Sequence, residues 1–286
     1  MLPAKQNGFS LLELIIVVVL LGVLASGAGL LITQPITAYN DQLRRQQLVD
    51  QAEMALRQIA RDVRRALPNS IRLGGTTTAL EMVNTVDGAR YRDEAGGLFT
   101  TSNDILDFSV ADTDFNLLGQ FSRLTSLAAN HRLVIYNTAP TDIYNDVTAD
   151  NNPGIVTPST ASLALTLNGG EHHINITPAF QFSQQSPGQR AFVIDGPISY
   201  ICDTAAGTLT RYDNYAYQDP QITSNVLMAA LPNVQSGLVA SQVSACRIRY
   251  NAGSAQRGGI ITIEISLTDT GETISLLHQV HVENVP

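Results

Sequence analysis

The stretch Gly8-Phe9-Ser10-Leu11-Leu12-Glu13 opens an apolar run that decides how this chain is organised. From Leu11 to Ile32, only Glu13, Ser26 and three glycines interrupt the large apolar side chains and alanines. At about 1.5 Å per residue, a helix of this length crosses the roughly 30 Å hydrocarbon layer of a bilayer. The sequence therefore predicts a transmembrane helix over residues 9–34.

The segment before this run is short and carries a candidate processing site. Residues 1–8, MLPAKQNG, contain one positive charge, Lys5, which favours a cytoplasmic N-terminus. A secretory signal peptide has its cleavage site after the apolar run. Here the candidate junction, Gly8–Phe9, lies before the run. We therefore expect residues 1–8 to be a leader peptide and the helix to stay on the mature chain.

Glu13 is an acid inside the predicted membrane helix, where an unpaired carboxylate costs several kcal/mol. Cleavage would create an α-amine on Phe9, which is positive at neutral pH and lies four residues from Glu13 on the same helix face. Between staggered helices, Glu13 could instead pair with the amine of a neighbour and fix the axial register. The alternative is an acid that reaches the lipid headgroups.

This motif resembles the type III signal of type IV prepilins and of type II secretion pseudopilins. These families have Gly before the junction, Phe after it and Glu as the fifth mature residue, as Gly8, Phe9 and Glu13 are here. The resemblance implies that a membrane prepilin peptidase cleaves after Gly8 and N-methylates Phe9. It also implies a single-pass inner-membrane protein with a periplasmic head that later enters a pilus. The implied partners are membrane lipid, the inner-membrane assembly platform and other major and minor pilins.

Residues 35–73 are expected to form the amphipathic second half of the stalk helix. Pro35 is expected to kink the helix or break one turn. Beyond it, apolar residues recur at helical spacing and Ala66-Leu67-Pro68-Asn69 ends the pattern. These apolar positions are Leu48, Ala52, Leu56, Ile59, Val63 and Leu67.

A narrower resemblance is carried by blocks along much of the chain. They are similar to the MshO family of minor pilins, which serves the mannose-sensitive haemagglutinin (MSHA) pilus. This resemblance implies a subunit that helps to initiate the pilus or assemble its tip. The related alternative is a J-type minor pseudopilin of type II secretion, and another is an adhesive periplasmic domain on an uncleaved membrane anchor. The blocks are Tyr39-Asn40-Asp41, residues 61–70 (RDVRRALPNS), residues 196–202 (GPISYIC) and residues 281–286 (HVENVP).

Residues 74–286 are expected to form a β-rich head, because short β-rich runs alternate with Gly, Asn, Asp and Pro. The predicted fold class is α+β, with an antiparallel head packed on the long N-terminal helix in a pilin-like arrangement. Asp269-Thr270-Gly271 is expected to be a hairpin turn. The candidate strands are 105–110, 132–136, 162–167, 191–194, 199–202, 209–212, 245–250, 260–267 and 273–282.

The chain has two cysteines, Cys202 and Cys246. In an exported chain one pair predicts a disulfide, and two buried free thiols are the alternative. A bridge would close a loop of about 43 residues and stabilise the fold by about 3 to 4 kcal/mol in the entropic description.

Charge and motifs favour a structural role. The net charge is −8, with +3 on residues 1–73 and −11 on the remainder, so an acidic head argues against nucleic-acid binding. The sequence has no GxSxG, HExxH, P-loop or dinucleotide-binding motif placed after a strand. We therefore expect neither an enzyme nor a cofactor.

Residues 141–154, TDIYNDVTADNNPG, are rich in Asp and Asn. Asp142, Asp146 and Asp150 are oxygen donors of the kind that Ca²⁺ prefers, but their spacing does not match an EF-hand loop. A solvated loop is therefore the favoured interpretation, with a calcium site as the alternative. Residues 139–154 are also a candidate for the variable tip of the head.

Overall fold

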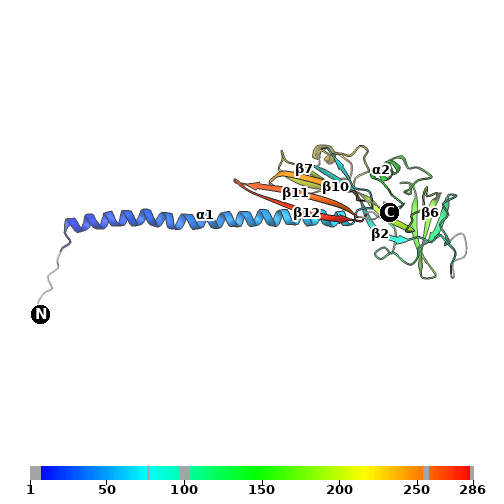
Figure 1. Ribbon diagram of the computed structural model, residues 1–286, viewed down its shortest axis with the longest axis horizontal. Coiled ribbons are helices and arrows are strands. Elements are labelled where there is room, and N and C mark those ends of the chain that lie inside the picture. The colour runs from blue at the N-terminus through cyan, green and yellow to red at the C-terminus, as the bar shows by residue number, and fades with distance from the viewer. Residues whose placement is uncertain (1–7, 76–77, 97–103, 254–257, 284–286) are drawn as a thin grey trace.

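The computed structural model describes residues 8–75, 78–96, 104–253 and 258–283, with the side chains of 28–33 left out. A single helix, α1 (Leu11–Arg64, 54 residues), dominates the shape of the molecule. At 1.5 Å per residue it is about 80 Å long. Its first half extends away from the rest of the chain and its second half lies against the head (Figure 1).

The remaining elements form the head. The other helices are α2 (Pro140–Ala149) and α3 (Asn225–Ala229). The strands are β1 (Arg72–Gly74), β2 (Ala79–Arg90), β3 (Asp112–Asn116), β4 (Arg132–Ile135), β5 (Ser162–Asn168), β6 (Glu171–Phe180), β7 (Arg190–Asp203), β8 (Thr208–Asp213), β9 (Gln235–Ser241), β10 (Val243–Asn251), β11 (Gly259–Asp269) and β12 (Glu272–Val282).

The strands make three antiparallel sheets. The central sheet has the order β1-β2-β7-β8-β9, and β4 also pairs with β7. The proximal sheet, β10-β11-β12, lies along α1, and the distal sheet, β3-β6-β5, lies at the end of the molecule farthest from the N-terminus (Figure 1). This is the predicted α+β, pilin-like fold class: a long N-terminal helix followed by an antiparallel β head.

Two large cores hold the head together. The core nearer the stalk joins α1 to the central and proximal sheets, and Ala52, Ile59 and Val63 of α1 are buried in it. All six apolar helix positions predicted from the spacing are buried. The distal core lies under the distal sheet and includes Phe115 and Phe180. Strands β2 and β7 supply side chains to both cores.

The C-terminal boundary of α1 differs from the sequence-based expectation. Pro35 lies inside α1, which is helical on both sides of it. α1 ends at Arg64, where the backbone N–H of Arg65 donates to the carbonyl of Asp62 and the N–H of Ala66 donates to the carbonyl of Val63. The expected end at Leu67 was therefore three residues too late.

Several strand predictions are confirmed, and others needed correction. The turn at residues 269–271 is confirmed, with positive φ at Thr270 (48°) and Gly271 (85°), as two-residue hairpin turns require. Residues 105–110 form no strand. The two strands predicted at 191–194 and 199–202 are one strand, β7, whose pairing with β2 shifts register beside Gly196 (φ 144°). A glycine tolerates this backbone conformation, so the strand continues where the sequence indicated a break.

Candidate processing and assembly site

The Gly8–Phe9 junction lies just before α1, in chain that is neither helix nor strand. The Phe9 side chain is 80% exposed, and Gly8 would meet nothing within 4 Å if it carried a Cβ atom. The rest of the predicted leader, residues 1–7, lies outside the described residues. The junction is therefore accessible to a protease.

Ser10 is the N-cap residue of α1 and was not singled out from the sequence. It is extended (φ −77°, ψ 148°), and its Oγ accepts a hydrogen bond from the backbone N–H of Glu13 at 3.3 Å. Ser10-x-x-Glu13 is the sequence signature of a capping box, so the signal was available. The cap uses the backbone of Glu13 and leaves its carboxylate exposed in the first turn, where the helix dipole favours a negative charge.

The N-terminal half of α1 exposes apolar side chains on every side. Leu11, Leu14, Val18 and Leu24 are each at least 60% exposed, and no residue of the head covers them. A helix that is apolar all round needs an apolar environment, which lipid or neighbouring helices can supply.

Within the described residues, we find no helix that meets the length and hydropathy of a membrane-spanning segment. The side chains of residues 28–33, which belong to the transmembrane segment predicted over 9–34, lie outside the described residues.

A buried polar joint fastens α1 to the central sheet. Asp62 is 8% exposed and accepts hydrogen bonds from Tyr200 Oη and Arg211 Nε, each at 2.7 Å. Arg211 also forms an ion pair with Asp213. Burial and the adjacent Asp62 carboxylate raise the pKa of Tyr200, so its hydroxyl stays a donor. Burial alone would lower the pKa of Arg211, but the bonds to Asp62 and Asp213 raise it.

A second polar cluster lies behind β1. Glu81 is 1% exposed and receives Arg72 Nε at 2.6 Å and Tyr215 Oη at 2.9 Å. The guanidinium of Arg72 lies 3.5 Å from the ring centroid of Tyr144 in a cation–π contact. Burial raises the pKa of Glu81 although Arg72 opposes the rise. This cluster fixes the start of the head to α2.

The predicted disulfide between Cys202 and Cys246 is present, with a Cα–Cα distance of 6.4 Å. Cys202 belongs to β7 and Cys246 to β10, so the bond links the central sheet to the proximal sheet. Both sheets pack on α1, and the bond closes one side of the core that holds it.

The expectation of a solvated loop over residues 141–154 is wrong for its first part, because residues 140–149 form α2. Pro140 occupies the first turn, and Asp142 caps the helix start by accepting the Ala139 N–H at 3.1 Å. Ile143 and Val147 are buried beside Leu67 at the end of the stalk. The region packs on the middle of the head, whereas the tip is formed by the distal sheet (Figure 1).

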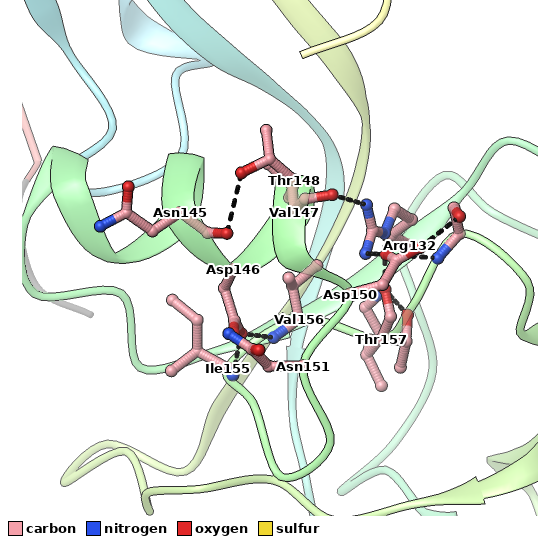
Figure 2. Close-up of polar contacts among 12 residues, drawn as sticks. Arg132, Asn145, Asp146, Val147, Thr148, Asp150, Asn151, Ile155, Val156 and Thr157 are labelled. Atoms are coloured by element: carbon pink, nitrogen blue, oxygen red, sulfur yellow. Dashed lines mark hydrogen bonds and ion pairs between the residues drawn. The ribbon is translucent and has the colours of Figure 1, made fainter. Parts of the chain in front are cut away.

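The candidate calcium ligands do not converge. Asp146 accepts the backbone N–H groups of Ile155 and Val156 at 2.5 and 3.2 Å, as Figure 2 shows. Asp150 pairs with Arg132 at 2.7 Å on the other side of the helix end. Among the described residues, no group of three or more His, Cys, Asp or Glu side chains is placed to hold a metal ion. Asp142, Asp146 and Asp150 instead form the hydrogen bonds and the ion pair that cap α2 and fix it to neighbouring segments.

Comparison with known proteins gives one finding. Residues 3–29 match the family described as the prokaryotic N-terminal methylation motif. Neither the curated proteins nor the solved structures gave a significant match. The matched motif, the long helix and the β head support a type IV pilin-like or pseudopilin-like protein. Such a motif implies processing by a prepilin peptidase, membrane anchoring and assembly with other pilins.

Proposed function

We propose that this chain is a minor pilin of an MSHA-type type IV pilus that helps to initiate the fibre or assemble its tip. A prepilin peptidase would cleave between Gly8 and Phe9 and methylate the Phe9 amine. The mature subunit would reside in the inner membrane with its head in the periplasm before it is assembled into the fibre.

One observation carries this proposal: an exposed processing junction directly precedes an uncovered apolar helix with a single acid in its first turn. Gly8 and Phe9 are accessible, and the apolar side chains that follow are solvent-exposed all round. Removal of residues 1–8 would leave the helix intact and create an amine next to its start. Stacked helices would then bury both the apolar surface and the acid.

Glu13 is the proposed register residue. Its side chain forms no ion pair with any described residue of its own chain, so its carboxylate is available to the Phe9 amine of a neighbour. A subunit with this acid can register against another terminus, which fits a position below the outermost subunit. The MSHA assignment depends on the sequence blocks at residues 61–70 and 196–202.

The processing step is tested by mass spectrometry of the protein purified from cells with an active prepilin peptidase. We expect a mature chain that begins at methylated Phe9. A Gly8→Val variant should keep residues 1–8 and its unmethylated terminus, whereas the control Asn7→Ala should be processed. A wild-type chain that keeps Met1 would instead support the tethered adhesive domain.

The fibre assignment is tested by deleting the gene in its native cell. Loss of surface pili with normal secretion supports the minor pilin. Loss of protein secretion with normal pili would support the minor pseudopilin of a type II secretion system. Re-expression of the wild-type chain is the control for either result.

We also propose that the role is structural and not catalytic. The polar residues with the most buried contacts join elements to one another: Asp62 joins α1 to β7 and β8, and Glu81 joins β2 to Arg72 and Tyr215. His172 Nδ1 accepts the Phe121 N–H at 3.0 Å, which is again a structural contact.

A further inference from the structure

A basic pocket lies where the end of the stalk helix meets the head. It has a volume of about 230 Å³, and arginines from three separate parts of the chain line it. Two of them are the last residue of α1 and its C-cap, one lies between β3 and β4, and one begins β7. The arginine pocket, as we call it, is lined in this way by Arg64, Arg65, Arg123 and Arg190.

This concentration of positive charge contrasts with the rest of the head. The residues that follow the stalk have a net charge of −11, so an isolated basic pocket is not what their composition predicts. A helix C-terminus favours arginines in its last turn, which accounts for Arg64 and Arg65. It does not account for Arg123 and Arg190, which reach the same pocket from other segments.

The two acids that line the pocket leave three of these arginines unpaired. Glu283 forms an ion pair with Arg190 at 3.5 Å. Among the described residues, the other three arginine side chains form no ion pair; they are Arg64, Arg65 and Arg123.

Asp87, the second acid, is occupied by donors of its own surroundings. Its Oδ1 accepts the Gly88 N–H at 2.9 Å and the Ser122 hydroxyl at 3.1 Å. Its Oδ2 accepts the N–H groups of Arg123 and Leu124 at 2.6 and 3.1 Å. These bonds fix the backbone of Arg123 beside the pocket, so Asp87 positions one arginine and neutralises none of the guanidinium groups.

Three unpaired guanidinium groups suit an oxyanion with more than one negative charge. Each guanidinium carries five N–H donors in a plane and pairs with two oxygens at once. A phosphate group carries about 1.5 to 2 negative charges at neutral pH and three strong acceptor oxygens. A carboxylate carries one charge and two oxygens, so it would leave more of the pocket unpaired.

We infer that the arginine pocket binds a phosphate group, either as free phosphate or as the monoester of a dissolved compound. The bound group would connect the end of α1 to β7 and to the segment that Asp87 holds. Arg64 is 53 residues past Leu11, which corresponds to about 80 Å along the helix. A bilayer with its headgroups is only about 40–45 Å thick, so a membrane around the start of α1 does not reach the pocket.

The site is tested by titration calorimetry of the full chain in an uncharged detergent, at constant ionic strength, with inorganic phosphate as the probe. We expect saturable binding of one phosphate per chain. Arg65→Gln and Arg123→Gln should each weaken it about tenfold, because each removes a charged hydrogen-bond donor. Both side chains are exposed, so denaturant unfolding without phosphate should be the same as for wild type.

Arg249→Gln is the matched control. Arg249 is an exposed arginine of β10 and does not line the pocket, so this variant should keep the wild-type affinity. Absence of saturable binding, or equal weakening in all three variants, would overturn the inference.

Two further probes define the group that is recognised. Acetate should bind at least tenfold more weakly than phosphate, and equal affinities would overturn the choice of phosphate. Glycerol 3-phosphate carries the same group as a monoester. Tighter binding of either phosphate compound supports the inference, and the tighter one identifies the source as free phosphate or as an ester.

Stability provides an independent readout. Phosphate at ten times its dissociation constant should lower the equilibrium constant of unfolding about tenfold in the wild type. The double variant Arg65→Gln/Arg123→Gln should show no such change at the same concentration. A shift of equal size in both proteins would be a general salt effect and would overturn the inference. Processing at Phe9 is measured separately, so failure of this site leaves the pilin assignment intact.

Discussion

Asp62 of the stalk helix and Tyr200 of β7 share a hydrogen bond of 2.7 Å across 138 residues of sequence. Arg211 completes the joint by donating to the same carboxylate oxygen. Tyr200 belongs to the core that joins α1 to the central and proximal sheets, Asp62 is buried, and Arg211 is partly buried. Together these side chains fix the rotation of α1 about its own axis relative to the head.

Removal of the Asp62 carboxylate should therefore destabilise the protein. We expect Asp62→Ala to lower the free energy of unfolding by about 3 kcal/mol, because it leaves Arg211 and Tyr200 without their acceptor. Urea unfolding of the detergent-solubilised full chain measures this. Asp50→Asn is the control: it removes an exposed acid from the same helix and should cost less than about 0.5 kcal/mol. Equal effects of the two variants would contradict a special role for the joint.

The disulfide should stabilise the head to a similar degree. We expect the double variant Cys202→Ser/Cys246→Ser to lose about 3 to 4 kcal/mol of stability, because the bond closes a long loop in the unfolded chain. Non-reducing peptide mapping should show the two cysteine peptides joined. A reductant should lower the melting temperature of the wild type and leave that of the double variant unchanged.

Glu13→Gln should separate the charge of Glu13 from its place in the helix cap. The cap uses the backbone N–H of Glu13 and Ser10 Oγ, so the variant keeps the start of α1. We expect normal membrane insertion and Phe9 processing but a large loss of fibre incorporation. Immunoblots of membrane and sheared-fibre fractions measure both, with Leu12→Ile as the matched control. Unchanged incorporation would count against pairing with a neighbouring terminus.

Asp87 should make stability depend on pH. Burial acts to raise its pKa, but the backbone N–H groups of Gly88, Arg123 and Leu124 and the Ser122 hydroxyl outweigh burial and lower it. Because the folded pKa lies below the ordinary 3.8, this stabilisation is present above that pH and is lost as pH falls through the folded pKa.

Asp87→Asn should accordingly cost about 1 to 2 kcal/mol at pH 7. The difference from wild type should shrink as the pH falls below 3.8, the ordinary value for an aspartate. Denaturant unfolding at a series of pH values checks this. A difference that stays constant down to pH 3 would show that the carboxylate charge is not the cause.

Local patterns predicted much of this fold. The spacing of Leu48, Ala52 and Leu56 indicated the buried face of α1, because helix periodicity can be recognised from residues that are close in sequence. Thr270-Gly271 predicted the hairpin between β11 and β12 for the same reason. The Gly8–Phe9 junction and Glu13 were recognisable because their spacing is itself the signal.

Other features depend on partners that are distant in sequence. Asp142 and Pro140 are helix-start signals, but the Asp and Asn content of residues 141–154 pointed to a loop. The burial of Ile143 and Val147 against Leu67 supports a helix there instead. Nothing local marks Asp62 as the partner of Tyr200 and Arg211. Such contacts emerge only when the sheets close around the rod.

Strands β2 and β7 have a mechanical consequence because each enters both cores of the head. The two strands pair from Ala79 and Ile201 at one end to Arg90 and Arg190 at the other. A pull on the rod therefore reaches the distal sheet through the backbone hydrogen bonds of the β2–β7 pair, whose register shifts near Thr85. A molecule bound at the distal sheet would therefore experience tension directed along the axis of α1.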